Sequence, residues 1–243
     1  MKNRLGLFLV SLLFLSCGKL LLNHLTKETI DADLMIYENT VTKNKVVYLP
    51  MIHLGNSSYY ESVKKKVDSL RALNYIIMYE GIQKGNVSAL DSITLNKKFR
   101  KVTGFYLTNY TNEKNESLPK ALRNSTYLSQ SVTNTGIDVI GDINIDYSLD
   151  SLIYKYEKNI KKVILNECDI KTDLLSEYNC KDTIKHNKYY LINTLRNEKI
   201  FNSIENNKTK NIVILYGKAH RFMIHAKLLD FKYELVHGKL KTF

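Results

Sequence analysis

Two histidines and two carboxylates stand at the ends of apolar, β-rich stretches of the chain. His53 follows KVVYLPMI, Glu80 ends NYIIMYE, Asp142 ends the stretch that begins at Gly136, and His220 follows KNIVILYGKA. In an open parallel α/β sheet, residues just past the carboxyl ends of the strands converge at one edge. Burying such groups is costly unless they are paired, so their shared placement favours a working site over four unrelated residues.

Each of these residues also has a purely structural interpretation. A histidine at a strand end commonly bonds only a backbone group. Glu80 could cap the turn that follows it, and Asp142 could be an Asx-type turn residue in GDIN. The site hypothesis therefore depends on whether the side chains meet in space.

The hydrophobic pattern predicts one α/β domain with a central, mostly parallel β-sheet flanked by helices and with a helical insertion over 82–136. Pro50 lacks a backbone donor and predicts an end or bulge of the first strand. Ser58 and Glu61 fit a capping box. The predicted strands are 45–52, 74–81, 136–144, 210–217 and 232–237. The predicted helices begin near Ser58 and cover 88–107, 117–132, 146–167, 182–207 and 221–230.

The first residues resemble an export signal. MKNR is basic, and the apolar core LGLFLVSLLFLS is shorter than the ~20 residues that span a bilayer. Ser16 and Cys17 close this core as in bacterial lipoprotein signals, in which the cysteine is lipidated. We expect a signal peptide at 1–16, a lipid-anchored tether and lead-in segment at 17–44, and a single domain at 45–243 in the bacterial cell envelope, on its periplasmic face or cell surface. An ordinary signal or an uncleaved anchor is the alternative.

The remaining cysteines and the net charge limit which partners are expected. Cys168 and Cys180 can pair only with each other within the chain, and export favours a disulfide over two thiols. The net charge of +12 comes mostly from lysines scattered through helical segments, which is typical of a solvated face. The sequence lacks a stripe of arginine interleaved with aromatic residues, which is the pattern that would predict nucleic-acid binding. The expected partners are the membrane, through Cys17, and a small molecule or peptide.

One resemblance covers residues 45–231. GKAH at 217–220, after a β-run and before a helix, resembles the Gly-x-x-His motif of the TraB/GumN and TIKI superfamily. LPMIH followed by a helix and YIIMYEG resembles the first such motif and the next strand with its glutamate. TLRNEKIFNSI resembles the arginine-bearing helix ahead of the last strand. Pro50 replaces the first motif's glycine, which leaves open an altered half-site.

The resemblance implies a hydrolase-like fold related to erythromycin esterases and metal-dependent TIKI proteases. His53 would be a general base or metal ligand, and Glu80 would orient a water or complete the ligand set. His220 would be a second ligand or an oxyanion stabiliser, and Arg196 would clamp a carboxylate or a developing negative charge. The metal would be manganese, cobalt or zinc.

These roles predict an exported, lipid-anchored hydrolase of peptide, ester or amide bonds. The alternatives are a non-catalytic lipoprotein that binds haem or a metal in the same cleft, and an interaction protein whose site has decayed. Arg196 also has a structural alternative, as a salt-bridged arginine on a helix surface.

Overall fold

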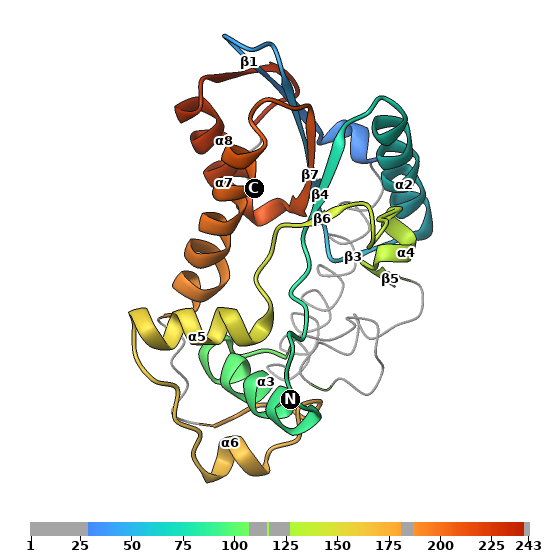
Figure 1. Cartoon of the computed structure of the whole chain (residues 1–243). Coiled ribbons are helices and arrows are strands. Elements are labelled where there is room, and N and C mark those ends of the chain that lie inside the picture. The colour runs from blue at the N-terminus through green and yellow to red at the C-terminus, as the bar shows by residue number, and fades with distance from the viewer. Residues whose placement is uncertain (1–28, 107–115, 117–126, 181–186, 241–243) are drawn as a thin grey trace, which may run out of the picture.

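A computed structural model of the chain describes residues 29–106, 116, 127–180 and 187–240 (Figure 1). The expected signal peptide, Cys17 and most of the helix expected at 117–132 lie outside these residues. Within the described part of the chain, no helix is both long and apolar enough to cross a membrane.

The centre of the molecule is a six-stranded mixed sheet with the order β6-β4-β7-β2-β1-β8. Neighbours among β6, β4, β7 and β2 pair in parallel, and β1 is antiparallel to both β2 and β8. A second, two-stranded sheet joins β3 and β5. The strands are β1 Met35–Asn39, β2 Lys45–Met51, β3 Leu54–Gly55, β4 Ile76–Tyr79, β5 Leu128–Ser129, β6 Ile143–Asn144, β7 Ile212–Gly217 and β8 Tyr233–His237.

Helices cover both faces of the large sheet, α2 on one side and α7 with α8 on the other (Figure 1). The expectation of an α/β fold with a mostly parallel sheet flanked by helices is confirmed. The helices are α2 Ser57–Ala72, α3 Ala89–Thr103, α4 Val132–Thr135, α5 Leu149–Asn159, α6 Glu167–Lys171, α7 Leu195–Asn206 and α8 Arg221–Asp230. Short 3₁₀ turns lie at η1 Ile30–Ala32 and η5 Lys218–His220, and η4 Tyr190–Thr194 is a π-helix that runs into α7.

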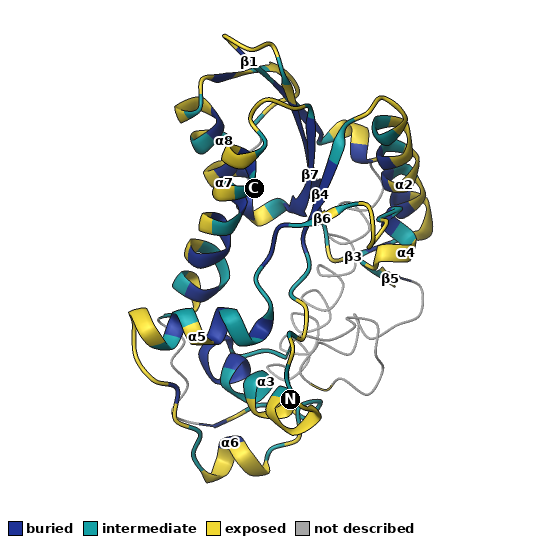
Figure 2. Cartoon of the chain, in the orientation of Figure 1, coloured by how far each residue is buried: buried dark blue, intermediate teal, exposed yellow. Residues whose placement is uncertain are grey.

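Strand β7 explains how the core is divided. All of its residues are buried, as expected for a parallel strand covered on both faces (Figure 2). Because successive side chains alternate, Ile214 and Tyr216 join the cluster with Ile200 of α7, whereas Val213 and Leu215 join the cluster under α2. The site-bearing end of β7 is therefore fixed by packing on both sides.

A third apolar cluster lies outside the two sheet layers. It is built by α3, α5 and η4, with Phe99, Leu152 and Leu191 fully buried. Nearby, Cys168 and Cys180 form the expected disulfide, with their Cα atoms 5.9 Å apart. We call α3, α5, α6 and η4 the helical lobe.

The structure differs from the predicted elements at the start of the domain. The segment expected to be a tether and lead-in contributes η1 and β1, so the sheet begins ahead of residue 45. Pro50 neither ends nor bulges β2, since it pairs with Tyr216 of β7. The last β2 residue paired with β1 is Tyr48, so Pro50 has a strand neighbour on one side only, where a missing donor is tolerated.

Helix boundaries also differ from the prediction. The cap of α2 is Asn56, whose Oδ1 accepts from Tyr59 N at 2.8 Å, and Glu61 instead accepts from Ser57 Oγ. The helix expected over 146–167 ends at Asn159. The part of the helix expected at 117–132 that the structure describes contains strand β5.

Candidate functional site

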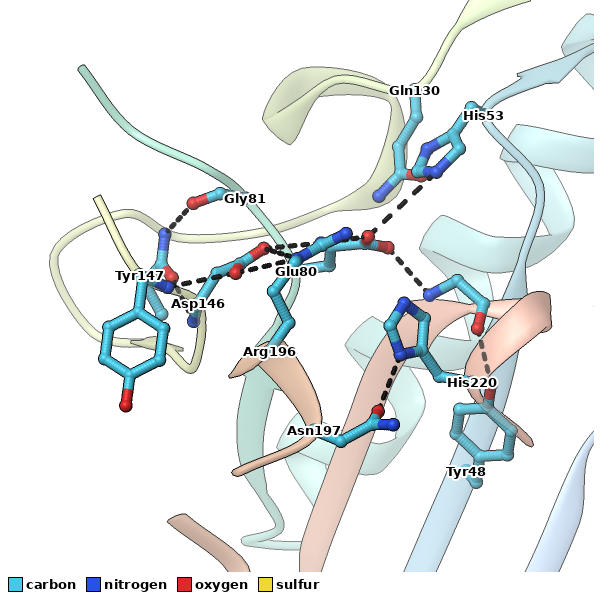
Figure 3. Close-up of polar contacts among 12 residues, drawn as sticks. Tyr48, His53, Glu80, Gly81, Gln130, Asp146, Tyr147, Arg196, Asn197 and His220 are labelled. Carbon is cyan, nitrogen blue, oxygen red and sulfur yellow. Dashed lines mark hydrogen bonds and ion pairs between the residues drawn. The ribbon is translucent and has the colours of Figure 1, made fainter. Parts of the chain in front are cut away.

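The carboxyl ends of β2, β4 and β7 lie side by side and bring three of the predicted residues together. Glu80 directly follows β4, and its backbone N–H donates to Leu215 of β7 at 2.9 Å. His53 lies between β2 and β3, and His220 closes the 3₁₀ turn after β7. Figure 3 shows their side chains around one carboxylate, that of Glu80.

Glu80 is buried, and both of its oxygens accept hydrogen bonds. Oε1 accepts from Arg196 Nη2, and Oε2 accepts from the backbone N–H of Gly217 at 2.7 Å. A Cβ on Gly217 would lie 3.1 Å from Oε2, so a larger residue here would press on this carboxylate. Tyr48 Oη donates to the Gly217 carbonyl at 2.8 Å, so both backbone groups of Gly217 are held.

Arg196, from α7, lies between two buried carboxylates (Figure 3). Its Nε donates to Asp146 Oδ1 at 3.0 Å, and its Nη2 donates to Asp146 Oδ2 at 2.6 Å as well as to Glu80. Burial opposes the guanidinium charge, but Tyr216, Asp146 and Glu80 raise the pKa of Arg196 well above its ordinary value. Burial likewise opposes the charge of Glu80, yet Arg196, His53 and His220 lower its pKa. Glu80 is therefore ionised at neutral pH.

His53 is the accessible member of the site, with 45% of its side chain exposed. Its Nδ1 lies 3.1 Å from Gln130 Oε1, and because a carbonyl oxygen only accepts, Nδ1 is the donor. In the neutral ring, Nε2 is then the acceptor nitrogen, and it lies 4.0 Å from Glu80 Oε1. The backbone supports this arrangement, since Gln130 N donates to the His53 carbonyl at 2.9 Å.

His220 is buried and held differently from His53. Its Nδ1 donates to Asn197 Oδ1 at 2.7 Å, and its ring packs edge-on against Tyr216 with centroids 4.8 Å apart. Burial, with a further contribution from Arg196, lowers the pKa of His220 to about 4. The imidazole is therefore neutral at pH 7 and adds no charge beside Glu80.

The site opens on a cavity of about 860 Å³. Its lining includes His53, Glu80 and Arg196, together with residues of the segment after β4, of β5, of α4 and of η4. A half-exposed imidazole and a buried, ionised carboxylate therefore face the same space, which is the arrangement needed to activate a water molecule.

Asp142 does not join this group. It precedes β6 instead of ending a long strand, and its Oδ2 accepts from Arg71 Nη2 at 2.6 Å and from Asp138 N at 2.8 Å. Asp142 therefore closes the turn that begins at Asp138 and pairs with Arg71, a structural role that differs from the Asx-type turn expected within GDIN. The carboxylate that reaches the site is Asp146, two residues past β6, which the sequence reasoning missed. The pattern INID, in which a carboxylate follows the buried Ile145, carried that signal.

Two polar partners were also missed, Gln130 and Asn197. Each orients one imidazole, and each comes from a segment far from its histidine in the chain. Amides of this kind are common on helices and loops, so nothing local in the sequence distinguishes them.

As arranged here, His53, Glu80 and His220 do not fit a divalent metal. Both Glu80 oxygens are engaged, one of them by a guanidinium cation that would repel a metal ion. Among the described residues, no group of three histidine, cysteine or carboxylate side chains is placed to hold a metal. The metal expected from the resemblance stays a prediction.

Comparison of the chain with protein-family models, curated proteins and solved structures finds no match. The TraB/GumN resemblance thus stays a prediction.

Proposed function

We propose that this chain is a hydrolase in which His53 and Glu80 activate a water molecule for attack on the carbonyl carbon of an ester, amide or peptide. The observation that carries the proposal is the 4.0 Å separation of His53 Nε2 and Glu80 Oε1 at the cavity. This distance is too long for a direct hydrogen bond and suits a water that bridges the two groups.

In the proposed mechanism, the bridging water donates one hydrogen bond to each group. His53 Nε2 takes a proton as the water oxygen bonds to the carbonyl carbon, and a tetrahedral oxyanion forms. His53 then returns that proton to the leaving oxygen or nitrogen as its bond to carbon breaks. Gln130 keeps the proton on Nδ1, so that Nε2 is the basic nitrogen throughout.

The other residues act as positioning groups. Arg196 holds Glu80 ionised and in place, and Asp146 in turn holds Arg196. Because the guanidinium of Arg196 is shared by two carboxylates, a role in positioning Glu80 is better supported than the expected role of clamping a substrate. His220 packs beside the carboxylate as a neutral group.

The resemblance to TraB/GumN and TIKI proteins supports the proposal, because its motif histidines and glutamate are the groups that converge at the strand ends. We also propose a TIKI/erythromycin-esterase-like relationship of the fold and lipid anchoring through Cys17. Changing Cys17 to Ala should release the protein from the membrane fraction, whereas unchanged membrane association would contradict the anchor.

A ligand-binding role without catalysis is the second candidate. A single accessible imidazole in a mainly apolar cavity is also what an axial ligand of haem requires. A Soret shift on haem titration that disappears in His53→Ala would favour this role.

The hydrolase proposal is tested with His53→Gln, using hydrolysis of p-nitrophenyl acetate and of a peptide library as the readout. We expect turnover to fall by roughly 10²- to 10⁴-fold, as for loss of a general base. The melting temperature should hardly change, since the side chain is half exposed. His237→Gln, on the exposed end of β8, is the matched control. Equal turnover in wild type and His53→Gln would overturn the proposal.

A further inference from the structure

The cavity extends beyond the reacting groups, and its further walls are mainly apolar. Ile82 comes from the segment after β4, Phe105 from the end of α3, Val132 from α4 and Ile192 from η4. Four separate parts of the chain thus contribute apolar side chains to one space. A volume of about 860 Å³ lies in the range of small-molecule sites.

Within the part of the chain that the structure describes, charge is confined to one end of this cavity. Among the described residues that line it, the charged or readily charged side chains are His53, Glu80 and Arg196. The other polar walls are the phenol of Tyr79 and uncharged amides and hydroxyls such as Asn144 and Ser129.

The charged groups at this end are already paired with one another. The guanidinium of Arg196 donates to two carboxylates, so a substrate carboxylate would not meet an unengaged arginine. With neutral imidazoles, Glu80, Asp146 and Arg196 sum to one negative charge, which repels anions. Each Glu80 oxygen already accepts from a protein donor, and the proposed water takes a further acceptor position on Oε1. The oxygens of Asp146 accept from Arg196 and Tyr147 N, so little acceptor capacity is left for a substrate cation.

We propose that the cavity selects an uncharged substrate with an apolar chain or ring next to the carbonyl group. The bond cleaved rests on the function proposed above, whereas the selection of a neutral apolar ligand rests on the cavity walls alone. Each methylene buried there should tighten binding by up to about fourfold, the value for full transfer from water.

Binding is measured first, without any turnover. The neutral fluorophore N-phenyl-1-naphthylamine is titrated into the full chain, and is then displaced with octanamide, octanoate or octylammonium. We expect saturable binding and displacement by octanamide at concentrations roughly tenfold or more below those needed for either ion, since burying an unpaired charge is strongly unfavourable.

Two variants test whether the probe binds in this cavity. Val132→Asp puts a charge on the wall, and its side chain is 41% exposed in the first turn of α4, where an aspartate is well tolerated. Val139→Asp tests a second wall position that is 60% exposed. Both should weaken probe binding at least fivefold, whereas Val41→Asp, an exposed valine outside the cavity, should not.

The outcomes separate this inference from the hydrolase proposal. Absence of saturable binding, equal displacement by the ions, or unchanged affinity in both wall variants would overturn the inference. Selective binding of neutral ligands supports it, and it does so even if His53→Gln shows that no ester or amide is hydrolysed. If hydrolysis is found, p-nitrophenyl octanoate should have a KM well below that of p-nitrophenyl acetate, and Val132→Asp should remove the difference.

Discussion

Among the described residues, two ion clusters are similarly buried but differ in their surroundings. At the strand ends, Arg196 joins Glu80 and Asp146, with each side chain no more than 7% exposed. In the helical lobe, Lys101 pairs with Asp169, also at 7% and 1% exposure. Burial alone would mark both as candidate sites.

Their neighbours distinguish them. The lobe cluster is closed, because Asp169 also accepts from Tyr178 Oη and Asn166 N, and the Arg100 guanidinium lies 4.5 Å from the centroid of the Tyr178 ring. The strand-end cluster opens on a cavity and faces a half-exposed imidazole. A buried charge therefore indicates chemistry only when a reactive group and open space lie next to it. The lobe cluster stands as the structural control for the site.

The largest predicted effect separates the clusters by activity. Glu80→Gln keeps the shape but removes the charge that orients the water, and should lower kcat/KM by roughly 10³-fold. Asp169→Asn, the matched change in the lobe, should leave kcat/KM of the folded protein within about twofold. Steady-state kinetics on a responsive ester measure both. A similar fall in the two variants would show that the clusters do not differ in function.

Unfolding measurements test whether the lobe cluster is closed. Lys101→Met leaves the Asp169 carboxylate buried without its cation, which should lower the free energy of unfolding by about 3–5 kcal/mol in urea denaturation. Lys171→Met breaks a solvent-exposed pair with Glu167 and should have little effect. A stable Lys101→Met protein would argue that the lobe cluster is not closed in solution.

The disulfide provides a third test of whether the helical lobe and the strand-end cluster differ in function. Cys168 and Cys180, with a sequence separation of 12, close a short loop beside the lobe cluster, so reduction should lower stability by about 2–3 kcal/mol in the chain-entropy model. The bond does not line the cavity, and turnover of the reduced, folded protein should be unchanged. The double variant Cys168→Ser/Cys180→Ser should not respond to reductant. Loss of activity on reduction would instead connect the lobe to the site.

Acid should destabilise the strand-end cluster first. The pKa of His220 falls from 6.5 to about 4 on folding, so the unfolded chain binds a proton between these values that the folded chain excludes. Stability from this residue is therefore lost as pH falls, by about 2 kcal/mol between pH 7 and pH 5. His220→Gln should flatten this slope in urea titrations, whereas Lys101→Met should keep it. An equal slope in wild type and His220→Gln would contradict the buried, neutral imidazole.

The sequence predicts the parts of the site that depend on local pattern. His53, Glu80 and His220 each follow an apolar run, and a residue at a strand end can be read from that run alone. Asp142 is predicted and Asp146 is missed because β6 has only two residues, so the short INID pattern is a weak periodic signal. The position of β6 is set by its pairing with β4, which is a tertiary interaction.

Partner residues are the least predictable part of the site. Asn197 lies 23 residues before His220 and Gln130 lies 77 residues after His53, so their roles arise only on folding. Strand β1 is a further example, because its short sequence predicts only a lead-in segment and its place in the sheet depends on pairing with β2 and β8. Strand–helix order is thus local information, and hydrogen-bond partners are not.

The smallest predicted effect concerns orientation. Gln130→Leu removes the acceptor that keeps the proton on His53 Nδ1, and one hydrogen bond of this kind corresponds to roughly five- to tenfold in kcat. Tyr178→Phe removes one hydrogen bond to Asp169 in the lobe and should cost about 1 kcal/mol of stability with no change in kcat. The variant Gln130→Glu should restore kcat, because a carboxylate also accepts from Nδ1, and should shift the pH profile upward. If Gln130→Leu and Gln130→Glu lower kcat alike, Gln130 acts by packing β5 against His53 and not by setting the tautomer.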